Sequence, residues 1–147
     1  MPARHLTIVR YPPGEGWRCA EIRQPSWLAI SAAIRAMDDD EFPWIQLSWK
    51  KAVASCGEDE QSLNIMGGAD AGFAVFEFMG RWQFEDPLGS NEDVRLWQSD
   101  QGYYCKRKNI IADVGDVLML AQVYFETGSY EALERASAQL RSKQNNR

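Results

Sequence analysis

Residues 63–84 read LNIMGGADAGFAVFEFMGRWQF, and this stretch decides the fold class. An apolar run at 63–66 ends in Gly67-Gly68, which is predicted to form a turn with positive φ. A second apolar run, 72–79, is followed by another glycine turn. Short apolar runs bounded by glycine turns are typical of antiparallel strands joined by tight connections. The stretch therefore predicts a meander of strands.

Further strands are predicted on both sides of this meander. Residues 44–50 alternate between two sets of side chains, with Ile45, Leu47 and Trp49 on one side, so we expect a strand with one buried face. Shorter extended segments are predicted at 5–10, 17–23, 94–98 and 102–106. Ser99-Asp100-Gln101 is expected to join the last two as a hairpin turn.

Helical spacing appears at two places, before and after the strands. Ser26 is a predicted N-cap, followed by apolar residues three or four positions apart: Trp27, Ile30, Ile34 and Met37. Asp113 begins a second predicted helix that ends at Gly128. Its face toward the sheet is expected to carry Val117, Leu118, Ala121 and Phe125. A last, shorter helix is predicted at 130–140.

This order of elements predicts an α+β fold: one antiparallel sheet of about five to seven strands, packed with two or three helices. The chain has 147 residues, of which 45% are hydrophobic and 25% charged, so a single domain over residues 1–147 is expected. No apolar run is long enough for a membrane helix, and the first residues do not have the pattern of a secretory signal. We therefore expect a cytoplasmic location.

Charge and reactive side chains limit the possible functions. The formal net charge of -5 repels nucleic acid and anionic lipid, so neither is an expected partner. The three cysteines, Cys19, Cys56 and Cys105, are odd in number and far apart, and they are expected to be reduced thiols. With His5 as the only histidine, a histidine-rich metal site or a Cys-His nucleophile is not expected. We expect no catalytic residue, cofactor or metal.

Partner binding is the function that the residues favour. Asp38, Asp39, Asp40 and Glu41 form the densest acidic run, in a predicted loop, and Trp44 follows closely as a candidate exposed anchor, a role also considered for Trp97. A second candidate loop contains Glu58, Asp59 and Glu60. The alternative interpretation is that these acids are merely solvated and that Trp44 belongs to the core.

From residue 63 to residue 133 the layout resembles a family of small α+β immunity proteins of bacterial polymorphic-toxin and contact-dependent-inhibition systems. The resemblance rests on the double-glycine strand, on MGRWQF (79–84), on GYYCKRKNII (102–111) and on the acidic-capped helix with its Thr127-Gly128 ending. The family often continues with proline and tryptophan, where this chain has Ser129-Tyr130-Glu131. The resemblance implies a non-catalytic protein that binds and neutralises a cognate toxin by covering its active site.

Three hypotheses about function follow. The first is an immunity protein that forms a one-to-one complex with a basic toxin domain, such as one that acts on nucleic acid or nucleotides. The second is a small metal-dependent hydrolase or transferase, which requires carboxylates to converge from separate acidic loops. The third is an adaptor or regulatory domain that uses the same acidic, aromatic surface in a weaker complex.

Overall fold

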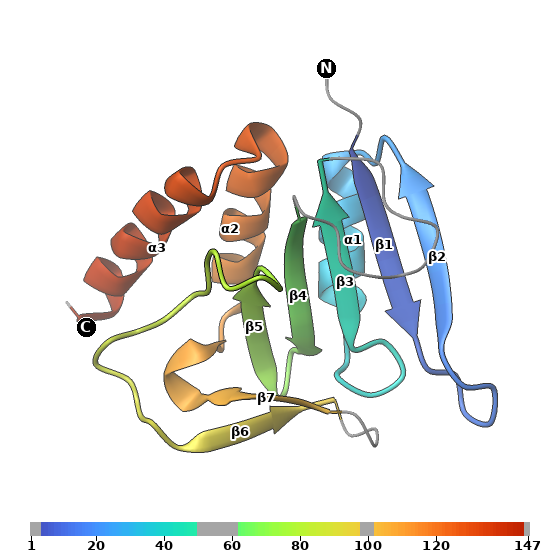
Figure 1. The fold of residues 1–147 in the computed structure, drawn as a ribbon, viewed down its shortest axis with the longest axis horizontal. Coiled ribbons are helices and arrows are strands. Elements are labelled where there is room, and N and C mark those ends of the chain that lie inside the picture. The colour runs from blue at the N-terminus through green and yellow to red at the C-terminus, as the bar shows by residue number, and fades with distance from the viewer. Residues whose placement is uncertain (1–3, 50–61, 98–101, 146–147) are drawn as a thin grey trace.

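The computed structural model describes residues 4–49, 62–97 and 102–145 (Figure 1). In these residues a six-stranded antiparallel sheet has the order β2-β1-β3-β4-β5-β8, and β6 and β7 form a separate hairpin. The strands are β1 (His5–Arg10), β2 (Arg18–Arg23), β3 (Trp44–Ser48), β4 (Ser62–Gly68), β5 (Gly72–Phe76), β6 (Asp93–Leu96), β7 (Tyr103–Lys106) and β8 (Ile110–Ile111). The helices are α1 (Trp27–Ala36), α2 (Val114–Thr127) and α3 (Tyr130–Asn145), with a 3-10 turn, η1, at Arg107–Asn109. The predicted α+β fold is confirmed.

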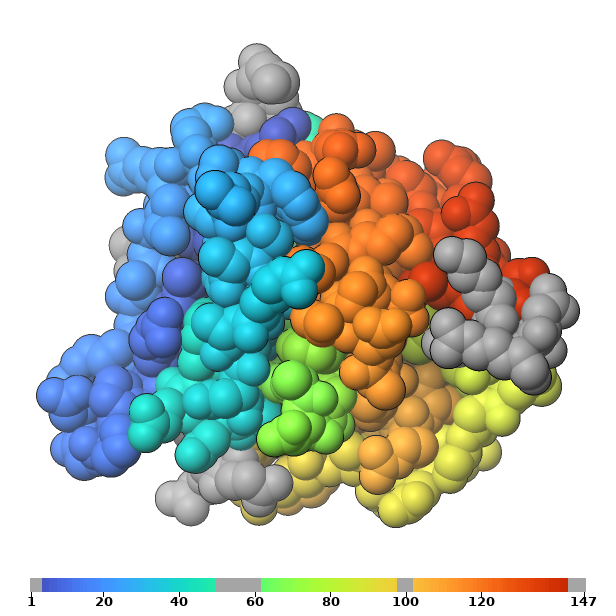
Figure 2. Space-filling view, turned by 180° about the vertical axis from the view of Figure 1, so that it is seen from behind, coloured from blue at the N-terminus to red at the C-terminus, as the bar shows by residue number. Residues whose placement is uncertain are grey.

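The strand register sorts side chains onto two faces of the sheet. Leu6, Leu47 and Leu63 lie opposite one another in one row, and Ile45 and Ile65 belong to the next. These rows face the helices: α1 lies behind the sheet in Figure 1, and Figure 2 shows α1 and α2 side by side on this face. The helix α3 packs on α2 and completes this main core with Leu133, Ala136 and Leu140.

Local sequence accounts for the ends of the helices. The hydroxyl of Ser26 accepts a hydrogen bond from the Ala29 amide at 3.0 Å, and the Asp113 carboxylate accepts one from the Gly115 amide at 2.8 Å. Gly128 has a φ of 62°, in the left-handed region, and its N–H donates to the Tyr124 carbonyl at 2.7 Å. All three predicted caps are confirmed because each uses the residue type that satisfies a free backbone group there.

The opposite face of the sheet carries a second core. Val9, Trp44, Met66, Ala74 and Phe76 pack there with Leu96 of the β6–β7 hairpin, which lies in front of the sheet in Figure 1. All five residues of β3 are consequently buried. The prediction that this strand has only one buried face is therefore wrong, because alternation along one strand does not reveal what a distant hairpin covers.

The double glycine ends β4 instead of forming the predicted turn, which lies at residues 69–71. Gly67 does have a positive φ, 123°, and a Cβ there would lie 2.0 Å from the Gly72 carbonyl oxygen. A Cβ on Gly68 would lie 2.5 Å from the backbone carbonyl carbon of Asp38. Both positions therefore require glycine because other backbone passes directly over them. The predicted turn at 99–101 lies outside the described residues.

The cysteines differ in part from the prediction that all three are reduced thiols. Cys19 is disulfide-bonded, so the prediction of reduced thiols is wrong for this residue, because spacing in the sequence does not measure distance in space. Cys105 is a free thiol whose burial raises its pKa to about 11, and Cys56 lies outside the described residues. Disulfides are typical of oxidising compartments, which counts against the expected cytoplasmic location.

The edges of the sheet are unequal. β8 has two residues, whereas β2 has six, and all six are exposed.

Among the described residues, no helix is long and apolar enough to cross a membrane.

Adjacent residues of α2 allow a direct test of the main core. Tyr124 is fully buried, whereas the neighbouring Phe125, a predicted core residue, is only partly buried, with its ring 6.0 Å from that of Trp27. We expect Tyr124→Ala to lower the free energy of unfolding by about 3–5 kcal/mol and Phe125→Ala by about 1–2 kcal/mol. Urea unfolding of both variants measures the difference, and an equal loss would contradict this orientation of α2.

Candidate functional site

The acidic loop, which we define as Asp38, Asp39, Asp40 and Glu41, connects α1 to β3. Asp38, Asp40 and Glu41 are exposed, whereas Asp39 is buried with 8% of its surface accessible. The loop thus presents three carboxylates to solvent and turns the fourth inward. The sequence correctly indicated a loop, but it did not distinguish the inward carboxylate from the other three.

Asp38 attaches the loop to the sheet. Its backbone forms a bridge with Gly68, at the position where the missing side chain leaves room. Its carboxylate accepts hydrogen bonds from the amides of Asp40, at 3.0 Å, and Phe42, at 2.8 Å. Side-chain oxygens that accept from backbone two to four residues ahead stabilise a turn. The turn is therefore held both internally and by β4.

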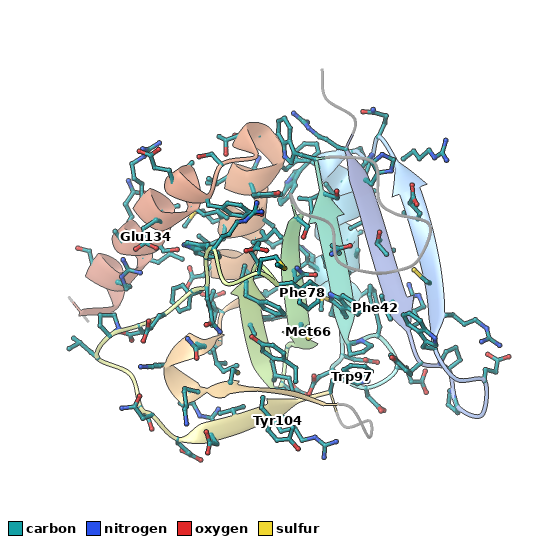
Figure 3. The ribbon with its side chains drawn as sticks, in the orientation of Figure 1. Phe42, Met66, Phe78, Trp97, Tyr104 and Glu134 are labelled. Carbon is teal, nitrogen blue, oxygen red and sulfur yellow. The ribbon has the colours of Figure 1, made fainter. Side chains whose placement is uncertain are left out.

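Asp39 attaches the loop to the β6–β7 hairpin. It has a φ of 62°, and its carboxylate accepts a hydrogen bond from the Trp97 amide at 2.6 Å. Figure 3 shows Trp97 beside this loop. Burial raises the pKa of Asp39, the charges of Asp38 and Asp40 raise it further, and the bond from Trp97 opposes the change.

A third attachment comes from Tyr11, the residue that follows β1. The Tyr11 amide donates to the Glu41 carbonyl at 2.7 Å, and the Tyr11 ring lies 4.7 Å from that of Trp97. Together the contacts to Tyr11, β4 and the hairpin fix the backbone that carries the exposed acidic residues. A binding loop that is already ordered loses little conformational entropy when a partner binds.

Trp44 is not the exposed anchor considered from the sequence. Its side chain is 9% exposed and belongs to the second core, with Nε1 donating to the Asn64 Oδ1 at 3.0 Å and the ring edge-on to Phe78 at 5.6 Å. Trp97 is also buried, at 8%. The prediction of an exposed tryptophan is wrong for both residues, because the hairpin and the aromatic side chains of the second core cover this face of the sheet.

The second predicted loop, with Glu58, Asp59 and Glu60, lies outside the described residues. The metal-dependent alternative requires acidic side chains that converge. Within the part of the chain that the structure describes, no group of three or more His, Cys, Asp or Glu residues is placed to hold a metal ion.

Sequence reasoning missed a hollow beyond the end of β5. We call it the aromatic hollow; it has a volume of about 270 Å³ and is lined by Phe76, Glu77, Phe78, Gly80, Trp82, Gln83 and Tyr103. Figure 3 shows Phe78 in front of the sheet. The repeated aromatic residues of FEFMGRWQF (76–84) are the sequence signal that could have indicated it. From the sequence alone, those residues are predicted only to form strands and a turn.

Comparisons of the chain with protein-family models, with curated proteins and with solved structures found no match. The acidic loop and the aromatic hollow are therefore the two surfaces from which a function can be inferred.

The buried carboxylate of Asp39 yields a prediction about stability and pH. Asparagine keeps the acceptor for the Trp97 amide and tolerates positive φ, so Asp39→Asn should be at least as stable as the wild type at pH 7. Asp39→Ala loses the bond and strains the backbone, and its free energy of unfolding should fall by about 2–3 kcal/mol.

The direction of the pH effect follows from the raised pKa of Asp39. The carboxyl of Asp39 therefore ionises at a lower pH in the unfolded state than in the folded state. As the pH rises through the folded-state pKa, the wild type loses stability relative to Asp39→Asn. Urea unfolding of both proteins from pH 4 to pH 8 measures this change. A wild type that gains stability over Asp39→Asn across this range would contradict the assignment.

Proposed function

We propose that the protein is an immunity protein that binds a cognate bacterial toxin and neutralises it by covering the toxin's active site. The observation that carries the proposal is the acidic loop, which has three exposed acidic residues on a backbone fixed by Tyr11, β4 and the β6–β7 hairpin. The resemblance of residues 63–133 to immunity proteins points in the same direction.

Electrostatics supports a basic partner. An enzyme that acts on nucleic acid or nucleotides presents a positive cleft to its substrate, and a rigid acidic loop can occupy such a cleft. The net charge of -5 also attracts a basic partner over a longer range than the acidic loop alone does. The proposal therefore favours a toxin that acts on nucleic acid or nucleotides and binds in a one-to-one complex.

The proposal also has consequences for location and chemistry. Such a complex protects the cell where its nucleic acids are, so the proposed location is the cytoplasm. Reductants there act on disulfides, and the proposal requires the fold to survive reduction of the Cys19 disulfide. The proposed role is stoichiometric inhibition, in which no residue of this chain acts in catalysis.

Co-expression tests the proposed function. The proposal predicts that a toxin domain is encoded directly upstream of this gene. That domain should stop growth when it is expressed alone, and co-expression of this protein should restore growth. The purified pair should form a one-to-one complex in which the toxin's activity is lost. A toxin that stays fully active in the presence of excess protein would refute the proposal.

Charge reversal tests the acidic loop as the contact surface. Asp40 and Glu41 have exposed side chains, so Asp40→Lys/Glu41→Lys should fold normally while slowing association with the toxin about tenfold at low salt. The association rate of this variant should also depend less on salt concentration than that of the wild type. Its dissociation rate should change less than its association rate. Stopped-flow kinetics at several salt concentrations measures these rates.

The matched control is Glu126→Lys/Glu131→Lys. It makes the same change in net charge at exposed positions on α2 and α3. Association of this control should slow much less than that of the loop variant. Equal slowing by the two variants would mean that only total charge matters and would remove the acidic loop as the docking site.

A further inference from the structure

Among the described residues, Glu77 is a buried carboxylate without a cationic partner. The residue is 3% exposed, and its two oxygens accept hydrogen bonds from the backbone amides of Met79, at 2.5 Å, and Arg81, at 2.7 Å. Across the described residues, no side-chain nitrogen of lysine, arginine or histidine forms an ion pair with it. Buried charges in proteins are usually paired, because removing a charge from water is costly. The amides compensate Glu77 only in part.

Glu77 is one of the residues that line the aromatic hollow. The Phe76 ring stacks on Tyr103 at 4.5 Å, with an interplanar angle of 9°, and meets Phe78 edge-on at 5.4 Å. Trp82 completes the wall. Aromatic faces attract cations through their quadrupole, and they do so more strongly where water is excluded. The hollow therefore combines two features that favour positive charge.

Other acids near the hollow already have cations. Glu134 accepts from Trp82 Nε1 at 2.9 Å and pairs with Arg141 at 2.7 Å, and Glu85 pairs with Lys108 at 2.7 Å. Of these three described acids, Glu77 is thus the one that forms no ion pair with another described residue. Met79, between the lining residues Phe78 and Gly80 in the chain, is 65% exposed and offers an apolar surface.

We propose that the aromatic hollow receives an arginine side chain of the partner protein. A guanidinium group is planar and weakly hydrated, so it can stack on an aromatic ring while its N–H groups donate to a carboxylate. Each carboxylate oxygen can accept more than one hydrogen bond, so Glu77 can keep its amide donors. This inference rests on the proposed function and specifies one anchor contact of the complex.

The first test uses ethylguanidinium as the probe on the isolated ¹⁵N-labelled protein. The probe should shift the indole N–H signal of Trp82 and the side-chain amide signal of Gln83 in a saturable way, with a dissociation constant on the order of millimolar. Ethylurea, which has a similar shape without the charge, should cause no saturable shift at the same ionic strength. No saturation with ethylguanidinium, or equal shifts with both compounds, would overturn the proposal.

Two variants locate the probe. Phe78→Leu keeps an apolar side chain but removes an aromatic face, and Glu77→Gln removes the charge. Each should weaken binding of ethylguanidinium at least about fivefold. If Glu77→Gln does not fold, the Phe78→Leu titration decides.

The control is Tyr104→Leu, which removes an aromatic ring that is 68% exposed and does not line the hollow. Its affinity for ethylguanidinium should equal that of the wild type. A loss of affinity as large as that of Phe78→Leu would place the probe elsewhere and overturn the proposal.

The toxin itself separates this inference from the proposed function. Phe78→Leu should dissociate from the toxin at least about fivefold faster than the wild type does, while Tyr104→Leu should not. If the toxin is neutralised and Phe78→Leu binds it unchanged, the immunity function stands and the arginine anchor is wrong. If ethylguanidinium binds as expected but the toxin is not neutralised, the immunity function fails and the hollow remains a site for an arginine of another partner.

Discussion

The close approach of the Asp38 backbone to Gly68 is the contact on which the candidate surface depends. Any side chain at Gly68 would occupy the space of the loop backbone. With the loop seated there, Asp39 reaches the Trp97 amide and Glu41 accepts from Tyr11. Gly68, which adds no binding group of its own, thus determines where the exposed charges lie.

The same contacts connect the two cores. The main core behind the sheet is supplied mostly by the sheet and the helices, whereas the second core depends on the β6–β7 hairpin. The hairpin meets the acidic loop through Trp97 and the aromatic hollow through Tyr103. Both candidate surfaces are therefore built on one small element, and a change in its position would affect them together.

Periodicity in the sequence predicted most of the fold, because strands with period two and capped helices leave local signals. Ser26, Asp113 and Gly128 are found at the helix ends, as predicted. The burial of Trp44 and the inward turn of Asp39 were not predictable, since both depend on a hairpin more than 50 residues away, as the Asp39–Trp97 contact shows. The disulfide of Cys19 and the isolated charge of Glu77 likewise depend on three-dimensional proximity, which no local pattern records.

The six exposed residues of β2 have a consequence for solubility at high concentration. Among the described residues, β2 pairs with another strand on one side only, and such an edge can pair with an extended chain and lead to aggregation. Arg18, Glu21 and Arg23 place three charges on this short strand. A second chain that paired with this edge would have to desolvate those charges. The charges on this edge therefore disfavour fibrous self-association, and this effect is separate from recognition of any partner.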